Sequence, residues 1–160
     1  MRKTAFLWVF LLLAAPALAW KGTKEISISG ALQKTERTTT RAEVRLGYFL
    51  SGRQEIEGSV QYDGVFYEGE SENTLLYECS YSYNLIEDKL PLFITAGIGR
   101  RVRTNSDDSS CFVLSIGGGL KAFIKGDLAL RVDYRLRRFF TEPERNRHDL
   151  TLGFSYFFKR

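Results

Sequence analysis

The feature that most constrains the fold is a strict two-residue alternation of apolar and polar side chains. It is clearest in DLALRVDYRLRRFF, residues 127–140, where even positions carry leucine, valine and tyrosine, and odd positions carry mainly arginine and aspartate. Such a period is typical of a β-strand with one apolar and one polar face. A soluble protein would bury the apolar face, whereas a barrel in lipid would bury the charged one.

The same alternation recurs along the chain, and no segment after residue 19 shows the 3.6-residue period of an amphipathic helix. The expected strands are residues 23–32, 41–50, 54–67, 74–84, 92–103, 111–124, 127–140 and 148–158. Short turns are expected at 51–53, 85–90 and 125–127, and longer polar loops at 33–40, 67–73, 104–110 and 141–147. Because alternate connections lie on opposite rims, the short turns fall on one rim and the long loops on the other. Outer-membrane barrels typically have short periplasmic turns and longer outer loops.

The first 19 residues have the features of a secretory signal peptide. The basic start MRKT precedes an apolar run, 5–19, that ends in Ala17-Leu18-Ala19. We expect cleavage between Ala19 and Trp20, which leaves 20–160 as a single barrel domain. The run is too short for a good transmembrane helix, which needs about 20 apolar residues. A mature chain that lies in a membrane must therefore form a closed barrel, because lipid satisfies no backbone hydrogen bonds.

The charge balance argues against a nucleic-acid partner. The chain has 23 basic and 19 acidic residues, and Arg2 and Lys3 belong to the expected signal peptide. No basic run is long enough to form a binding tail, since RRVR at 100–103 and RLRR at 135–138 interleave with apolar positions.

The polar faces of the strands suit a crowded interior. Charges of both signs nearly match, and pairing lets charged groups tolerate partial desolvation. Serine and glycine between them leave room for long arginine side chains in an eight-stranded lumen, which side chains can fill. The residues expected to form this lumen charge network are Arg41, Glu43, Arg45, Glu55, Glu57, Asp63, Glu78, Arg101, Lys121, Arg131, Asp133 and Arg135, and the same polar faces carry Arg103, Arg137 and Asp149.

The apolar faces end repeatedly in aromatic side chains, which are typical of the girdles at the two membrane interfaces. The strands are also long enough to cross a bilayer, for which about 9–11 tilted residues suffice. The residues expected to face lipid or form a girdle are Tyr48, Tyr62, Tyr81, Tyr134, Phe154, Tyr156 and Phe158. Together these features favour an all-β, eight-stranded antiparallel up-and-down transmembrane barrel.

The last strands also resemble a known family. GGGLKAFIKGDLALRVDYRLRRF, followed by RHDLTLGFSYFF, is similar to the C-terminal part of small bacterial outer-membrane β-barrel proteins, the porin-like relatives of the OmpA transmembrane domain. The resemblance covers roughly residues 112–158. It implies an outer-membrane location among lipids and lipopolysaccharide. It also implies that periplasmic chaperones deliver the chain and that the outer-membrane assembly machinery inserts it. That machinery recognises a last strand that ends in an aromatic residue such as Phe158.

Few residues suit catalysis or metal binding, and we expect no catalytic residue, cofactor or metal. His148 is the only histidine, and the adjacent Asp149 points to the opposite face of a strand, so the pair does not make a hydrolytic site. One histidine and two separated cysteines do not form a usual ligand cluster. Cys79 is expected on the lipid side and Cys111 on the lumen side of strands that are not neighbours, which predicts two free thiols.

The leading hypothesis is a barrel with a largely plugged lumen that serves envelope structure or surface interaction and conducts narrowly at most. One alternative is a soluble periplasmic ligand-binding barrel, similar to a lipocalin, with the apolar face turned inward. Another is a lipid A-modifying barrel enzyme that uses His148.

Overall fold

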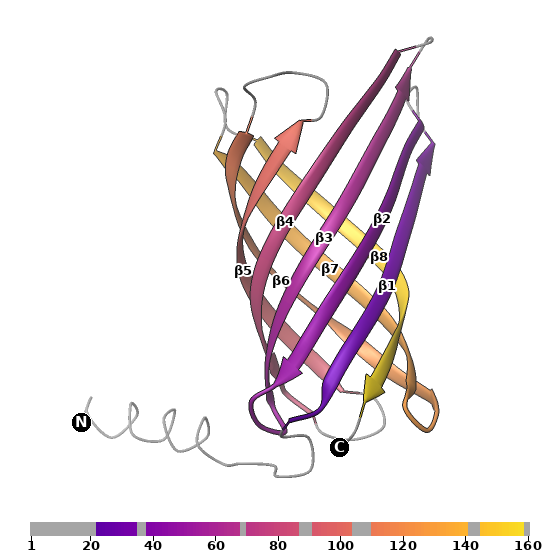
Figure 1. Ribbon diagram of the computed structural model, residues 1–160, viewed down its shortest axis with the longest axis vertical. Helices are drawn as coiled ribbons and strands as arrows, with labels where there is room; N and C mark the ends of the chain where they lie inside the picture. Colours follow the sequence, from indigo (N-terminus) through magenta and orange to yellow (C-terminus); the bar gives the residue numbers. More distant parts are fainter. Residues whose placement is uncertain are drawn as a thin grey trace, which may run out of the picture.

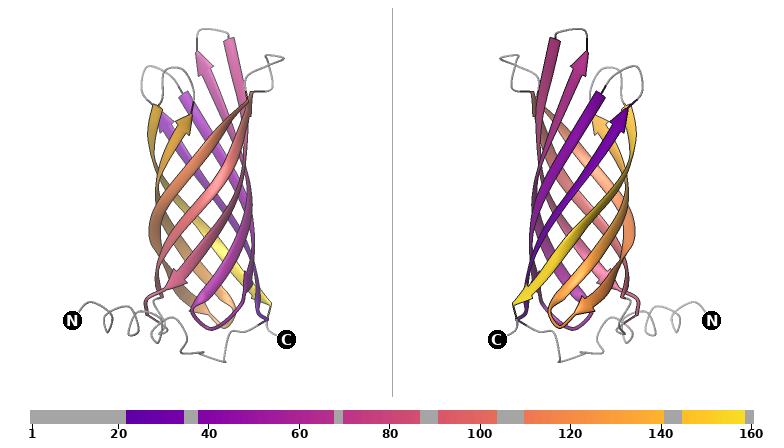
Figure 2. Two further views of the ribbon diagram at one scale, coloured as in Figure 1. Left: turned by 90° about the vertical axis from the view of Figure 1, so that its left-hand side faces the viewer. Right: turned by 90° about the vertical axis from the view of Figure 1, so that its right-hand side faces the viewer.

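The computed structural model is a closed barrel of eight strands, each antiparallel to its neighbours (Figures 1 and 2). The structure describes residues 22–34, 38–67, 70–86, 91–103, 110–140 and 145–158. The strands are β1 (Lys24–Lys34), β2 (Thr38–Phe49), β3 (Gln54–Tyr67), β4 (Glu70–Asn84), β5 (Leu92–Arg103), β6 (Ser110–Lys125), β7 (Leu128–Phe140) and β8 (Arg145–Phe158). The expected up-and-down barrel is confirmed. The expected signal peptide lies outside the described residues.

The alternation of side chains sets the two faces of the wall. In β7 every odd-numbered residue from Ala129 to Phe139 is buried in the lumen, and the even-numbered residues point outward. Most outward side chains of the wall are apolar, and many are strongly exposed, as in Ile28 at 63% and Leu150 at 65%. The expected girdle residues are all exposed on the outer wall: Tyr48, Tyr62, Tyr81, Tyr134, Phe154, Tyr156 and Phe158. This arrangement is the reverse of a lipocalin-like barrel.

The connections at one end of the barrel are shorter than the expected loops. β1 starts and β8 ends on the same rim, which also carries the connections β2–β3, β4–β5 and β6–β7 (Figure 1). We call it the periplasmic rim and the opposite one the outer rim. The expected long outer loops at 33–40 and 67–73 are wrong, because only residues 35–37 separate β1 from β2, and only 68–69 separate β3 from β4. The strands continue through polar sequence there, since backbone pairing needs no apolar face.

The seam between the first and last strands is the shortest part of the wall. β1 pairs with β8 from Lys24, opposite Phe158, to Gly30, opposite Leu152. Beyond that point each strand pairs only with its sequence neighbour. The expected tight turn between β6 and β7 is confirmed, and Gly126 has a φ of +52°, a conformation that glycine adopts without strain. No helix among the described residues is long and apolar enough to cross a membrane.

Candidate functional site: the charged lumen

The lumen contains charged side chains that form a continuous series of ion pairs along the barrel. Near the periplasmic rim, the Lys121 ammonium group lies 2.5 Å from a Glu25 carboxylate oxygen and 2.8 Å from one of Glu55. All three side chains are almost completely buried. They come from β6, β1 and β3, which are not neighbouring strands. The contacts therefore span the lumen.

Arg131 of β7 continues this series. Its guanidinium nitrogens lie 2.9 Å from Glu25, 2.9 Å from Glu57 and 2.7 Å from Asp133. Asp133 also accepts a hydrogen bond from Arg45. A guanidinium group has five N–H donors, which allows one arginine to hold three carboxylates. Arg131 is the central cation of the periplasmic half.

Two further arginines of β7 extend the series toward the outer rim. Arg135 contacts Glu57 at 3.4 Å and also donates to Glu78. The Arg137 Nε lies 2.9 Å from Glu78, and its Nη1 lies 2.5 Å from Asp149 of β8. β7 thus supplies three cations of this series, Arg131, Arg135 and Arg137, whereas the others come from β2, β6 and β8.

The outer end of the series joins two arginines with two aspartates. Arg41 lies 2.8 Å from Asp63 and 2.6 Å from Asp149. Arg147 lies 2.7 Å from Asp63 and 2.9 Å from Asp149. Each arginine thus bridges both carboxylates. The ion pairs run unbroken from Lys121 near the periplasmic rim to Asp63 near the outer rim.

The structure brings together most of the residues expected in the lumen network. Those that take part in ion pairs are Arg41, Glu43, Arg45, Glu55, Glu57, Asp63, Glu78, Lys121, Arg131, Asp133 and Arg135. Arg101 is partly buried, and its guanidinium carbon lies 5.2 Å from the centroid of the Phe139 ring. Arg103 is exposed, because β5 ends there at the outer rim.

Four more charged residues belong to the series. Arg137 and Asp149 lie on the polar faces where the alternation places them. Glu25 and Arg147 are additions that the sequence reasoning missed. The alternation could have identified Glu25, because it is an odd-numbered residue of β1 and therefore lies on the same inward face as the buried Ser27. Arg147 falls in 141–147, a segment expected to be a loop, whereas β8 already begins at Arg145.

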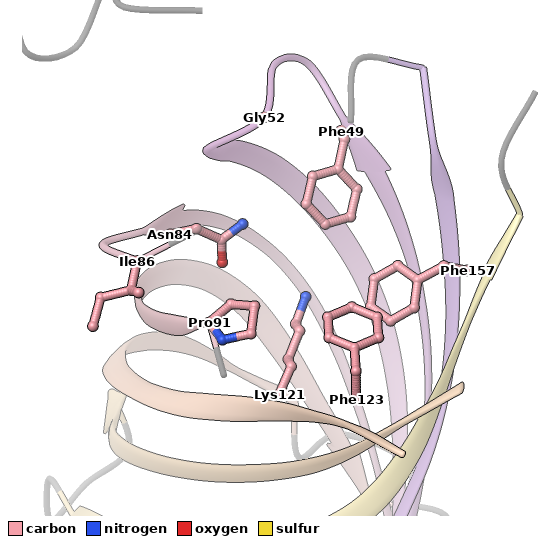
Figure 3. A pocket seen from close by; sticks show the side chains of 8 residues that line it. All are labelled: Phe49, Gly52, Asn84, Ile86, Pro91, Lys121, Phe123 and Phe157. Atoms are coloured by element: carbon pink, nitrogen blue, oxygen red, sulfur yellow. The ribbon is translucent and has the colours of Figure 1, made fainter. Parts of the chain in front are cut away.

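Aromatic rings pack together at the periplasmic end of the lumen, on one side of a small pocket (Figure 3). The Phe157 ring centroid lies 6.1 Å from that of Phe49 and 5.1 Å from that of Phe123. The Lys121 nitrogen points toward these rings and lies 5.2 Å from the Phe49 centroid, a cation–π geometry. The cavity between these side chains has a volume of about 10 Å³. That space holds one water molecule at most.

The single histidine of the chain contacts a tyrosine on the outer wall. The Tyr134 hydroxyl lies 2.6 Å from Nδ1 of His148, and both side chains are exposed on the outer wall. The side chain of Asp149 is buried on the other face. Cys79 is exposed, Cys111 is partly buried, and both are free thiols, as predicted. Among the described residues, no group of three or more histidine, cysteine, aspartate or glutamate side chains is arranged to hold a metal ion.

Comparison with protein families decides the class of barrel. The family model described as "Outer membrane protein beta-barrel domain" matches residues 5–158. The chain belongs to this family. It is a bacterial outer-membrane barrel, with buried charge pairs in its lumen. Its surroundings are therefore the lipids and lipopolysaccharide of that membrane. No curated protein sequence matches the chain significantly.

Solved structures of low sequence identity share the fold of this outer-membrane barrel. The N-terminal barrel domain of Pseudomonas aeruginosa OprF has a TM-score of 0.59 at 18% identity, covering 86% of this chain and 98% of that one. OprG from Pseudomonas aeruginosa has a TM-score of 0.61 at 10% identity, with 89% and 99% covered. The outer-membrane enzyme PagL has a TM-score of 0.52 at 19% identity, with 82% and 98% covered. The fold alone thus does not separate enzymes from other barrels.

Proposed function

We propose that this outer-membrane barrel serves envelope structure or surface interaction with a closed lumen, and conducts narrowly at most. The unbroken series of ion pairs from Lys121 to Asp63 carries the proposal. Salt-bridged side chains occupy the space that a water path would need, since an eight-stranded barrel is just wide enough for side chains to fill. Below them, the rings of Phe49, Phe123 and Phe157 pack together at the periplasmic end and fill part of the lumen there.

The energetics of buried charge support a lumen that stays closed. Opening a path through the lumen would separate carboxylates from arginines that are 1–2% exposed, such as Arg131 and Arg45. Removing one partner of a buried ion pair costs about 3–5 kcal/mol, because the remaining charge stays buried and uncompensated. A conducting state would have to break several pairs at once. The closed state is therefore the stable one.

Planar-bilayer recording tests the closed lumen. Purified protein is expected to give no steady, large conductance steps. A variant with Arg131→Ala and Lys121→Ala, which removes two lumen cations, is expected to conduct more than the wild type. Arg138→Ala, on the outer face of β7, is the matched control and is expected to behave like the wild type. Steady large steps from the wild-type protein would contradict the proposal.

We also propose that the barrel is not an enzyme. Support comes from the position of His148, which pairs with Tyr134 on the outer wall while the adjacent Asp149 faces the lumen. A hydrolytic mechanism needs a base held by an acid and a nucleophile within reach. Lipid A extracted from bacteria that express the protein is expected to keep its mass. A mass change that disappears in His148→Ala would establish the enzyme instead.

For biogenesis, we propose that residues 1–19 direct export and that 20–160 form the barrel domain. Sequencing of the mature protein is then expected to begin at Trp20. We further propose that periplasmic chaperones deliver the chain and that the assembly machinery reads β8. Its outward residues alternate and end in the exposed Phe158. Phe158→Ala is expected to slow membrane assembly in cells, and an unchanged assembly rate would contradict this role.

A further inference from the structure

The outer wall of the barrel is not evenly covered by large side chains. A groove of about 670 Å³ crosses the wall from β2 to β6. The strand register explains it, because Leu46, Gly58, Cys79 and Ile98 lie side by side in neighbouring strands and form one row across the wall. Gly58 and Cys79 are small, so the row is hollow at its centre.

A second row borders this groove on the side of the outer rim. It contains Val60, Tyr77, Arg100 and Phe112, which are also direct neighbours in the register. The next member is Phe140, the last residue of β7. The rows cross strands that are tilted in the barrel (Figure 2). They start in the periplasmic half of β2, where Leu46 lies three residues before the strand end, and reach the outer ends of β6 and β7 at Phe112 and Phe140. The groove therefore leads from the membrane interior toward the outer surface.

Two outward-facing arginines lie where the rows reach the outer rim. Arg100 lines the groove, and its Nη2 donates a hydrogen bond of 2.8 Å to the Ser110 hydroxyl. Arg138 of β7 extends the first row, which contains Gly58, Cys79 and Ile98. The rings of Phe112 and Phe140, with centroids 5.7 Å apart, lie beside them in the second row. The Arg138 guanidinium carbon is 5.5 Å from the Phe140 centroid. Both arginine side chains are exposed.

An arginine on the lipid-facing side of a barrel is tolerated at the membrane interface and costly at the midplane. These two residues are therefore expected at the outer interface, where lipid head groups carry phosphate. Guanidinium groups bind phosphate with two parallel hydrogen bonds. The outward pair has the chemistry of a phosphate site.

We propose that this groove binds an acyl chain of a phosphorylated glycolipid of the outer leaflet, with its phosphates at Arg100 and Arg138. The apolar groove matches the chain, and the two arginines, on separate strands, match a head group with two phosphates. Outer-leaflet lipopolysaccharide has this chemistry. The site uses only the outer wall and does not depend on whether the lumen conducts.

Retained lipid, measured by native mass spectrometry, tests the site. The protein is released from nanodiscs of phosphatidylethanolamine and phosphatidylglycerol that contain a small fraction of diphosphoryl lipid A. Two variants address the site: the double variant Arg100→Gln with Arg138→Gln, and Gly58→Leu. Leucine fits at Gly58 because an added Cβ meets no atom within 4 Å. The controls are Lys24→Gln and Ala122→Leu, which change charge and bulk toward the periplasmic rim.

The wild-type protein is expected to retain diphosphoryl lipid A in preference to phosphatidylglycerol. Loss of two charge-assisted phosphate contacts should lower retention by about tenfold or more. Gly58→Leu should lower it as well, and both controls should retain as much as the wild type. All variants are compared only as folded barrels, judged by the mobility shift of unheated samples. Equal retention by all proteins would overturn the site, and equal loss of phosphatidylglycerol and lipid A in the variants would overturn the glycolipid as its occupant.

Discussion

The two faces of β7 show how position decides what an arginine does. Arg131, Arg135 and Arg137 point inward, are about 1% exposed and each contact at least two carboxylates. Arg138 follows directly on the chain, points outward and lies against the Phe140 ring. The inward arginines hold the barrel together from inside, whereas the outward one sits where lipid head groups are expected. Matched pairs of inward and outward substitutions therefore test the account.

The largest contrast is expected between Arg131→Met and Arg138→Met. The first leaves Glu25, Glu57 and Asp133 without their shared cation and should lower the free energy of unfolding by about 3–5 kcal/mol. The second removes an exposed charge and should cost less than about 1 kcal/mol. Urea unfolding in lipid vesicles measures both. Adding Glu57→Gln to Arg131→Met should restore part of the loss, because one uncompensated charge disappears. Equal effects at 131 and 138 would contradict the buried network.

Neighbouring phenylalanines at the end of β8 give the next contrast. Phe157 is 1% exposed in the ring cluster, and Phe158 is 45% exposed on the outer wall. Phe157→Ala should lower the free energy of unfolding by about 3 kcal/mol, because it opens a cavity between Phe49 and Phe123. Phe158→Ala should cost clearly less. The same vesicle assay measures both. A larger loss of unfolding free energy for Phe158→Ala than for Phe157→Ala would contradict the packing of the Phe157 ring inside the barrel.

Two glycines on opposite faces give a smaller contrast. An added Cβ at Gly119 would lie 2.1 Å from the Val132 carbonyl oxygen and 2.7 Å from Phe93 Cζ, whereas none of the surrounding atoms comes within 4 Å at Gly58. Gly119→Ala should therefore destabilise the barrel by about 1–3 kcal/mol. Gly58→Ala should stabilise it by up to about 1 kcal/mol, because glycine weakens a strand interior. A stabilising Gly119→Ala would show that the strands can move apart there.

The smallest contrast concerns hydroxyl groups. The Ser27 hydroxyl is buried, donates to Glu25 at 2.6 Å and lies 2.7 Å from the Ser155 hydroxyl across the β1–β8 seam. Ser27→Ala should cost about 1 kcal/mol, since it leaves a buried acceptor with one partner fewer. Tyr134→Phe, which breaks the exposed contact with His148, should cost only a few tenths of a kcal/mol. A larger effect at Tyr134 would give that contact an unassigned role.

The sequence predicted the barrel because lipid and lumen impose opposite demands on successive residues. Inward Arg131 and outward Tyr134 follow from that rule alone. The rule weakens near the outer rim, where 67–73 is polar on both faces and was expected to be a loop, although β4 already begins at Glu70. The odd or even position of a residue in its strand also does not say which side chains contact each other across the lumen. The contact between Lys121 and Glu55 depends on how β6 and β3 are staggered around the barrel, a property of the whole fold.

The central claim is that the apolar face lies against lipid, and Cys79 provides a native reporter of it. In a Cys111→Ser variant, Cys79 is the one remaining cysteine. A nitroxide spin label at Cys79, in the reconstituted barrel, can be relaxed by oxygen, which concentrates in lipid, or by a water-soluble nickel chelate. The account predicts strong relaxation by oxygen and little by the nickel chelate, with both effective after unfolding in urea. Strong relaxation by the nickel chelate in the folded protein would contradict it.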